Sequence, residues 1–374
     1  MELPVAAHVP HLGQVVPSVL SALGAGEFAN SLSLAEASSA CVLLIDGLGW
    51  ELLAEHAADA PVLTQLAKSP LRVGFPATTA AGLGAIGTGL ASGEHGLVGY
   101  SFEVPGTGVL NALRWSSHVD GGDLRGALPP REVQPLPTTF ERAAAAGITT
   151  SVVSSAKFAD TALTRATQSG ARYVGVHALG DLAACVLHCL EARPAFCWGY
   201  HSELDMLGHI YGPGSAPWRM QLRHVDRLVE SIVDGLPAGA LLAVVADHGM
   251  VTVEGALDID ETPALLGGVR AIGGEVRARH VYSEAGAEAD VLAAWREVIG
   301  DRAWILPRDE AIEAGWFGPV SDRVRPRIGD VVVAAKGRFG LVRELAEAVE
   351  SSLVGQHGSL TPAEQLVPLV LARG

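Results

Sequence analysis

The segment from Phe75 to Tyr100 reads FPATTAAGLGAIGTGLASGEHGLVGY, and the rest of the chain can be interpreted around it. Thr78 and Thr79 follow a proline, and small residues then recur at helical spacing, with glycines that allow close backbone packing. A hydroxyl at the N-terminus of a helix is well placed to attack an anionic phosphorus centre, because the free N–H groups and the helix dipole favour negative charge there. Such a hydroxyl needs a base or a metal to become a good nucleophile. Taken alone, however, a Thr-Thr pair before a helix is more often a cap.

Composition limits the classes of protein that fit. The chain has 374 residues, of which 49% are hydrophobic, so it is long enough for one large α/β domain or a core with an inserted subdomain. Its formal net charge of −15 argues against a nucleic-acid scaffold. An anionic substrate stays possible, because the charge of a bound metal can outweigh the global charge. The four cysteines form no CxxC pair, which predicts free thiols in a reducing compartment.

The N-terminal residues, MELPVAAHVPHLGQVVPSVLSALG, contain no basic segment and no long apolar run. We therefore expect no signal peptide, no transmembrane helix and no membrane partner, and a cytoplasmic location. The sequence makes no prediction of the oligomeric state.

Two buried strands are predicted to end in acidic residues. The apolar run Cys41–Ile45 leads into Asp46, and the run Ala240–Ala246 leads into Asp247 and His248. Side chains just beyond the carboxyl ends of parallel strands lie where open α/β sheets bind ligands. Asp46 could equally cap the helix that follows. An adjacent acid and imidazole after a buried strand would need partners in a dry place, which favours a metal site.

A third cluster follows the predicted strand Pro194–Tyr200. Asp205 and His209 are four residues apart, so one helical turn places them on the same face. This spacing is a weak metal signal alone and gains weight from the preceding strand and the Gly-Pro-Gly turn that closes the segment. His357, in GQHGSLTP before a last strand at Gln365–Leu371, has no ligand partner nearby in the sequence.

The remaining pattern is that of alternating strands and helices. Residues 101–135 are rich in glycine, proline and polar residues and predict an irregular excursion near the site. The other expected elements are a strand at Leu71–Phe75 that delivers the threonines, a helix at Thr138–Gly147, a strand at Ile148–Ser154, and helices at Asp181–Ala192 and Trp218–Asp234.

Residues 255–345 differ in character, with many glycines and arginines, short strand-like pieces and one helix at Ala287–Ile299. They predict an inserted, cap-like α+β subdomain. Arg277, Arg279 and His280 are candidates for contacts with an anionic substrate, although surface ion pairs are the simpler interpretation. The expected organisation is an N-terminal extension with one short helix at 1–40, a core at 41–254 and 346–374, and the insert at 255–345.

The clusters suggest two metal sites, and we expect two divalent ions, zinc first and manganese as the alternative. Three protein ligands with an open position describe a catalytic site, and two metals about 4 Å apart would hold the attacking and leaving oxygens of an in-line displacement. One site could comprise Asp46, Asp247, His248 and a threonine hydroxyl, and the other Asp205, His209 and His357.

At this point the chain resembles the alkaline phosphatase superfamily and, within it, the nucleotide pyrophosphatase/phosphodiesterase branch. The resemblance runs from about Cys41 to Ala372 outside the insert, on LLIDGLGW, FPATTA…GTGLASGEHGL, DMLGHIYGPGS, ADHGM and GQHGSLTP. It implies an alkaline-phosphatase-like three-layer α/β/α sandwich with a mostly parallel sheet and a smaller inserted α+β subdomain.

The resemblance also assigns roles to residues. In the family the nucleophile is a threonine nine residues before a Thr-Gly pair, and counting back from Thr88-Gly89 gives Thr79. The family pattern then implies one metal on Asp46, Thr79, Asp247 and His248, and the other on Asp205, His209 and His357. The branch usually has an asparagine shortly after the His-Gly turn. Here Tyr100 stands there, and its phenol can donate a hydrogen bond to a phosphoryl oxygen with different geometry.

The function expected is that of a two-metal-dependent phosphoric ester hydrolase of the phosphodiesterase/nucleotide pyrophosphatase type. A small phosphate ester or nucleotide would form a covalent phosphothreonine at Thr79, with the backbone N–H of Ala80 donating to a non-bridging oxygen. A threonine nucleophile argues against sulfate esters, because the superfamily's sulfatases resemble one another in a modified Cys or Ser.

Several alternatives stay open at this stage. The nearest are a phosphomonoesterase and a phosphonate hydrolase of the same superfamily. A cofactor-independent phosphomutase shares the core, but its nucleophile is usually serine and its insert is larger and differently placed. A non-catalytic metal-binding or partner-binding domain is of a different class. It is disfavoured because all seven ligand positions carry suitable side chains.

Overall fold

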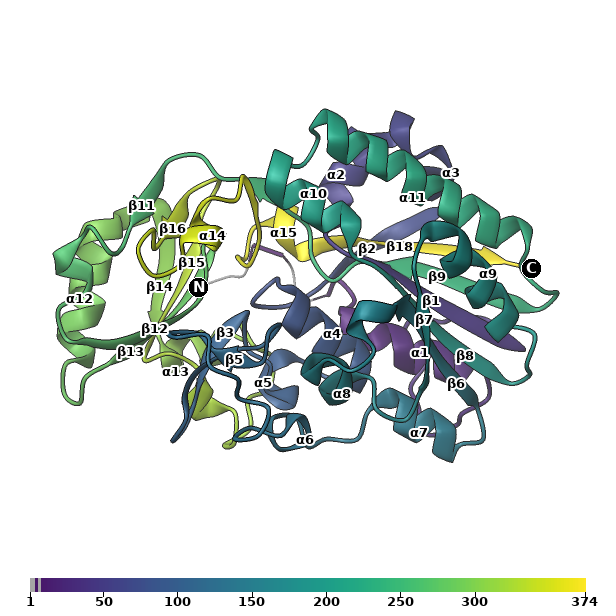
Figure 1. Cartoon of the computed structure of the whole chain (residues 1–374), viewed down its shortest axis with the longest axis horizontal. Helices are drawn as coiled ribbons and strands as arrows, with labels where there is room; N and C mark the ends of the chain where they lie inside the picture. The colour runs from purple at the N-terminus through teal and green to yellow at the C-terminus, as the bar shows by residue number, and fades with distance from the viewer. Residues whose placement is uncertain (1–3, 6–7) are drawn as a thin grey trace.

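The computed structural model describes residues 4–5 and 8–374, and a seven-stranded sheet forms its centre (Figure 1). Five neighbouring strands, β9, β1, β8, β6 and β7, run parallel. Strand β18 runs antiparallel to both β9 and β2. In sheet order the strands are β2 (Ala67–Arg72), β18 (Leu366–Arg373), β9 (Ala240–Val245), β1 (Ser39–Ile45), β8 (Ala195–His201), β6 (Thr149–Ser155) and β7 (Arg172–Val176). The prediction of an α/β fold with a mostly parallel sheet is confirmed.

Helices cover both faces of this sheet, which accounts for the continuous apolar runs of its central strands. Every residue of β1, β8 and β9 is buried. One layer holds α2 (Trp50–Glu55), α3 (Pro61–Leu66), α9 (Leu179–Cys189), α10 (Glu203–Tyr211) and α11 (Ala216–Asp234). The other holds α1 (Val15–Ala22), α4 (Thr79–Thr88), α7 (Thr139–Ala145) and α8 (Ala162–Thr167). The three-layer arrangement implied by the resemblance is therefore present.

The strand predicted at Leu71–Phe75 was placed too late in the chain. The structure has β2 at Ala67–Arg72, and residues 73–78 form no strand. The reason is the length of the partner strand. Arg72 pairs with Leu366, the first residue of β18, and the residues before Leu366 form the short helix α15 (Pro362–Gln365). Beyond Arg72 the chain has no neighbouring strand to extend the ladder.

The excursion at 101–135 is more regular than predicted. It contains a small antiparallel sheet of three strands followed by a short helix, and these strands have only two to four residues, too few to show a clear period in the sequence. Helix α5 (Ser92–His95) precedes the excursion, whose own elements are β3 (Ser101–Val104), β4 (Gly108–Asn111), β5 (Ser116–Ser117) and α6 (Pro130–Val133).

The smaller α+β unit lies at the left of Figure 1 and is built on a separate antiparallel sheet of order β12-β13-β15-β14. Helix α12 (Glu288–Ile299) covers it, and Trp295 at its centre belongs to a second hydrophobic cluster distinct from that of the large sheet. The strands are β12 (Val269–Glu275), β13 (Ala278–Ser283), β14 (Ala303–Pro307) and β15 (Val331–Ala335), with α13 (Arg308–Glu313) beside them. Two pairs of short strands, β11 (Ala256–Asp258) with β16 (Gly340–Val342) and β10 (Val251–Thr252) with β17 (Gly355–Gln356), lie where this unit meets the rest of the chain.

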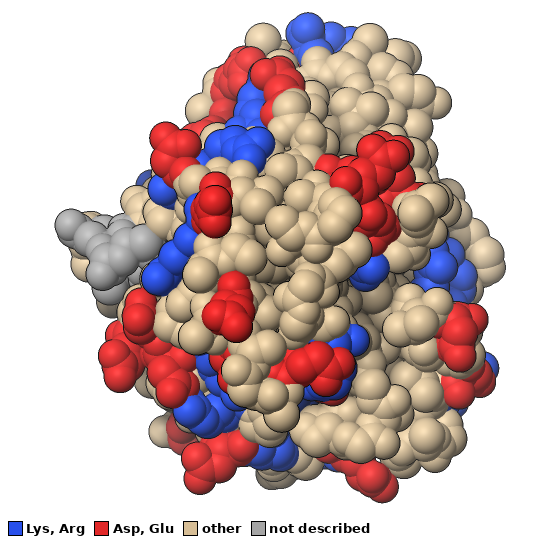
Figure 2. Space-filling view, turned by 90° about the vertical axis from the view of Figure 1, so that its left-hand side faces the viewer, with Lys and Arg blue, Asp and Glu red and all other residues tan. Residues whose placement is uncertain are grey.

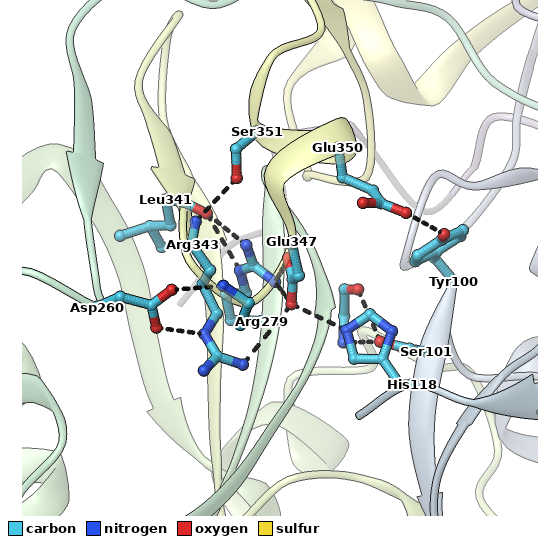
Figure 3. Close-up of polar contacts among 12 residues, drawn as sticks. Tyr100, Ser101, His118, Asp260, Arg279, Leu341, Arg343, Glu347, Glu350 and Ser351 are labelled. Atoms are coloured by element: carbon cyan, nitrogen blue, oxygen red, sulfur yellow. Dashed lines mark hydrogen bonds and ion pairs between the residues drawn. The ribbon is translucent and has the colours of Figure 1, made fainter. Parts of the chain in front are cut away.

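Arg277, Arg279 and His280 do not lie at the surface, so the prediction of surface ion pairs was wrong. Both guanidinium groups are fully buried, Arg277 against Glu364 of α15 and Arg279 against Glu347 (Figure 3). His280 is also buried and its Nε2 lies 2.9 Å from the carbonyl of Val98. A buried charge is tolerated when it is paired and hydrogen-bonded, and the acidic partners here come from distant parts of the sequence.

The residues predicted as an N-terminal extension contribute to the core, because Val15, Val16, Val19 and Leu20 of α1 are fully buried.

The four cysteines are free thiols as expected, and all but Cys185 are buried. No helix in the described part of the chain is long and apolar enough to cross a bilayer. Over the end of the molecule that carries the smaller unit, Figure 2 shows acidic and basic side chains interspersed.

Candidate active site

The site lies at the edge of the large sheet where its parallel strands end. Asp46 follows β1, and Asp247 and His248 follow β9, which pairs with β1. Strand β8 pairs with β1 on the other side and leads into α10, which carries Asp205 and His209. Because the carboxyl ends of parallel strands meet at one edge, strand order brings these residues together.

His357 joins them from the loop after β17. Its Nε2 lies 3.2 Å from Nε2 of His209, which in turn lies 3.3 Å from Oδ2 of Asp205. The imidazole rings of His357 and His248 stack with their centroids 3.5 Å apart. The structure therefore brings the two predicted ligand clusters into one continuous site.

Thr79 is the threonine that faces this site. It is the first residue of α4, and its Oγ1 lies 3.2 Å from Nε2 of His248. Thr78, at the N-cap, donates its hydroxyl hydrogen to Glu275 in a 2.7 Å hydrogen bond. Helix α4 approaches closely because Gly82 has no side chain, since a Cβ there would lie 2.4 Å from Cβ of Asp247.

All three site histidines have their Nδ1 atoms at backbone carbonyls. Nδ1 of His209 lies 2.7 Å from the oxygen of Gly355, that of His248 2.9 Å from the oxygen of Gly249, and that of His357 2.9 Å from the oxygen of Ala77. A carbonyl only accepts, so Nδ1 carries a proton, and a neutral imidazole held in this way presents the lone pair of Nε2 to the site. This is how backbone partners orient imidazoles that bind metals.

Three buried carboxylate oxygens in the site have no hydrogen-bond partner among the described residues: Oδ1 of Asp46, Oδ1 of Asp205 and Oδ2 of Asp247. Burial raises the pKa of Asp46 well above its usual range, and the neighbouring Asp247 and Asp205 raise it further. Crowded buried carboxylates are costly unless a cation compensates them. The orphaned oxygens and the exposed Nε2 lone pairs therefore fit divalent metal ions.

The candidate ligand atoms form two groups, each within 4.8 Å. One comprises Asp46, Asp247 and His248, the set predicted from the sequence together with Thr79. The other comprises Asp205, His357 and His248, so His248 lies between the two groups. His209, predicted for the second set, lies beside it at the distances given above.

Two cavities meet at these residues. The smaller, about 300 Å³, is lined by Asp46, Thr79, Lys157, Phe158 and Tyr173. The larger, about 520 Å³, is lined by Thr79, His209 and His357 together with Tyr100, Arg114 and Glu275. Thr79 and Asp205 line both cavities, so a group bound beside Thr79 has access to both.

The sequence profile of type I phosphodiesterases/nucleotide pyrophosphatases matches residues 40–360, which is most of the chain. The chain belongs to this family. No curated protein matches it in sequence.

Solved structures of phosphorus-ester and phosphonate hydrolases share the family's fold with this chain. Murine ectonucleotide pyrophosphatase/phosphodiesterase 5, an inactive variant in complex with AMP, matches with a TM-score of 0.68 and 16% identity, over 90% of this chain and 88% of that one. Human ectonucleotide pyrophosphatase/phosphodiesterase 5 matches with a TM-score of 0.67 and 15% identity, over 89% and 87%. Phosphonoacetate hydrolase from Sinorhizobium meliloti 1021, in complex with phosphonoformate, matches with a TM-score of 0.68 and 20% identity, over 90% of each chain. As a member of this family the chain is a phosphoric ester hydrolase.

The two predicted substrate-binding residues lie at the site in different ways. Ala80 is buried in the first turn of α4, next to Thr79. Tyr100 lines the larger cavity, but its hydroxyl donates a 2.7 Å hydrogen bond to Oε1 of Glu350, in the short helix α14 (Ala348–Ser351) (Figure 3). Burial raises the pKa of the Tyr100 phenol well above its usual range, and the Glu350 carboxylate raises it further. The phenol is therefore a neutral donor already engaged with a protein acceptor.

Two further residues of the site were missed by the sequence analysis. Tyr200, at the end of β8, donates a hydrogen bond to Oδ2 of Asp46, which fixes that carboxylate. Its place at a strand end was a usable signal. Glu275 reaches the larger cavity from β12, and no pattern in the sequence shows which edge of the smaller unit faces the site.

Proposed function

We propose that this member of the family is a two-metal phosphodiesterase or nucleotide pyrophosphatase that acts through a covalent phosphothreonine at Thr79. One observation carries the proposal. Three imidazole lone pairs and three unpartnered carboxylate oxygens converge beside a threonine hydroxyl at the N-terminus of a ten-residue helix. This donor set suits zinc, and manganese is the alternative.

In the proposed site, Asp46, Thr79, Asp247 and His248 would hold one ion, and the other would lie on Asp205, His209 and His357. Bound divalent ions would supply positive charge that lowers the pKa of the Thr79 hydroxyl and offsets charge on the phosphoryl group. Tyr200 supports this arrangement by holding the carboxylate of Asp46 from the side opposite its free oxygen.

The proposed reaction has two displacements. Oγ1 of Thr79 loses its proton to solvent and forms a bond to phosphorus, while the bond to the leaving oxygen breaks and that alkoxide takes a proton from solvent. Water then attacks the phosphothreonine, which releases a phosphomonoester and restores the hydroxyl. In the proposed reaction the N–H of Ala80, in the first turn of α4, would donate to a non-bridging oxygen during both steps.

The two cavities favour a diester or anhydride over a monoester. Thr79 lines both cavities, of about 300 Å³ and about 520 Å³, so a phosphorus atom within its reach could direct one substituent into each. The larger cavity is partly walled by Glu275 and Val276, so we propose that the insert at 255–345 acts as a cap on the core formed by 41–254 and 346–374.

Metal analysis combined with turnover of bis-p-nitrophenyl phosphate and p-nitrophenyl phosphate tests this function. We expect about two zinc or manganese ions per chain and a preference for the diester. Thr79→Ala should keep its metals and lose turnover, whereas Thr79→Ser, which restores a hydroxyl, should recover part of it. Full activity in Thr79→Ala with metals bound would disprove the covalent route.

Phosphonate hydrolysis is the second candidate, and Lys157 is the observation that favours it. Lys157 lies over the ring of Phe158, with Nζ 4.7 Å from the centroid, and both residues line the smaller cavity beside Thr79. An ammonium group there could pair with a carboxylate attached to phosphorus through carbon. Release of inorganic phosphate from phosphonoacetate at a higher rate than diester turnover, and its loss in Lys157→Met, would favour this reaction.

A further inference from the structure

Glu275 lines the larger cavity, and only one of its two carboxylate oxygens has a hydrogen-bond partner among the described residues. It is 8% exposed, and its Oε2 accepts the 2.7 Å hydrogen bond from the hydroxyl of Thr78. Its other oxygen, Oε1, is buried and has no hydrogen-bond partner among the described residues. A buried acceptor left unpaired is costly, so this oxygen is a candidate for contact with a ligand.

Close packing determines where the carboxyl group of Glu275 lies. Gly358 has a φ of +133°, and a Cβ added there would lie 3.0 Å from Oε1, so only glycine permits this approach. Nδ1 of His357 is 4.0 Å from Oε2 and is engaged with the carbonyl of Ala77. No Lys or Arg among the described residues forms an ion pair with Glu275.

Other polar side chains that line this cavity are engaged with protein partners. The hydroxyl of Tyr100 donates to Glu350, and the guanidinium of Arg114 lies 3.9 Å from the same carboxylate oxygen. Figure 3 shows Tyr100 and Glu350 facing each other. The side-chain amide of Gln356 donates to the backbone oxygens of Glu350 and Leu353. Apart from Asp205, which we propose as a metal ligand, Glu275 therefore brings to this cavity a buried carboxylate oxygen that no donor among the described residues uses.

We propose that Glu275 is a specificity-determining residue that binds a hydroxyl group on the ester arm in the larger cavity, and that the substrates are phosphodiesters of polyhydroxylated alcohols. A hydroxyl both donates and accepts, so it pairs with a carboxyl group in either protonation state. A simple alkyl arm would bury Oε1 without a partner, whereas a hydroxylated arm satisfies it. This inference rests on the diesterase function proposed above.

Symmetric diesters test the proposal without requiring knowledge of which arm leaves. Bis(2,3-dihydroxypropyl) phosphate and dipropyl phosphate have the same carbon chain and differ only in their hydroxyl groups. Hydrolysis of each is followed by phosphorus NMR, with bis-p-nitrophenyl phosphate as the reference substrate. We expect the metal-loaded enzyme to favour the hydroxylated diester in kcat/KM by about tenfold or more.

Three variants separate substrate contact from a structural role. In Glu275→Met the preference should fall to near one, while Glu275→Gln, which keeps a polar group at the same place, should retain most of it. Thr78→Val removes the Thr78 hydrogen bond but leaves Oε1 in place, so it should change both rates by the same factor. Metal content is measured for every variant, and Glu254→Gln, at an exposed ion pair with Arg338, is the control for handling.

The outcomes distinguish this inference from the proposed function. Turnover of the reference diester with no preference between the alkyl esters would overturn the role of Glu275 and leave the diesterase function intact. Equal loss on both esters in Glu275→Met, or loss of its metals, would make Glu275 a structural residue and also overturn it. If the wild-type enzyme hydrolysed no diester, the proposed function would fail, and the inference with it.

Discussion

Arg277 and Glu364 form a bidentate ion pair whose two side chains are both completely buried. Nε of Arg277 lies 3.0 Å from Oε1 of Glu364, and Nη2 lies 2.7 Å from Oε2. The arginine stands in the turn between β12 and β13, and the glutamate lies in α15 beside the large sheet. The pair therefore fastens the smaller unit to the rest of the molecule at a point that solvent does not reach.

Breaking this pair should be strongly destabilising. Glu364→Gln leaves the guanidinium of Arg277 buried without a countercharge, and such losses cost about 3–5 kcal/mol of the free energy of unfolding. Urea denaturation measures the change. Replacing both residues, in Arg277→Met/Glu364→Leu, should recover much of it, because the desolvated charge is gone. Asp123→Asn, which breaks the exposed pair with Arg125, should have no measurable effect. A double variant no more stable than Glu364→Gln would contradict this account.

The ion pair between Glu347 and Arg279 should make stability depend on pH. Burial alone would raise the pKa of Glu347, but Arg279 and His118 outweigh it and lower that pKa to about 2. Because the folded-state pKa is depressed, the stabilisation is fully present above the usual value of 4.5 and is lost as pH falls toward about 2.

The difference in unfolding free energy between wild type and Glu347→Gln isolates this contribution. We expect it to be large near neutral pH and to shrink between about pH 4.5 and pH 2. Glu310→Gln, at a mostly exposed ion pair with Arg296, should give a small difference that changes little over the same range. A Glu347→Gln difference that stayed constant on acidification would show that the charge of Glu347 is not what stabilises the fold.

Replacing His209 should remove one metal and spare the other. His209→Ala removes one ligand from the proposed set that also contains Asp205 and His357, but leaves Asp46, Asp247 and His248 intact. Metal content should therefore fall by about one ion per chain. Elemental analysis after desalting gives the stoichiometry, and the rise in Tm on adding zinc to stripped protein gives an independent readout. His188→Ala, an exposed histidine of α9, should change neither value. Retention of both ions in His209→Ala would remove it from the ligand set.

Adding one methyl group at Gly82 should impair catalysis through Asp247. The new Cβ would lie 2.4 Å from Cβ of Asp247, so α4 or the loop after β9 must move. A misplacement of about 1 Å can cost about 100-fold in rate, so kcat should fall sharply for Gly82→Ala. Gly180→Ala is the matched control, since it also lies in a helix but has no atom within 4 Å of the added group. Wild-type kcat in Gly82→Ala would show that the contact relaxes without consequence.

The strand-end residues were within reach of the sequence, because a buried parallel strand is visible in a short window. Asp46 and Asp247 follow continuous apolar runs, and the common edge of the sheet then brings them together. The helical spacing of Asp205 and His209 was likewise local information. His357 has no such signal, and its assignment needed the resemblance to the family.

The errors arose where structure depends on partners far along the chain. The end of β2 at Arg72 is set by the start of β18 at Leu366, near the other end of the chain. Arg277 and Arg279 can be buried because each pairs with a glutamate, Glu364 and Glu347 respectively. These partners lie 87 and 68 residues further along the chain. Glu275 enters the cavity only once β12 is placed against Thr78, 197 residues earlier. Periodicity and composition carry no information about these pairings.

The hairpin of β12 and β13 carries Glu275 on the cavity side and Arg277 two residues later, buried against α15. An insertion or deletion between them would shift the anchor, the cavity wall or both, so the length of this turn is fixed by two separate requirements. A chimera that exchanges only the residues of the smaller unit between two relatives would consequently fail. A working chimera would have to carry Glu364 and Glu347 along with the hairpin, although both lie outside it in the sequence.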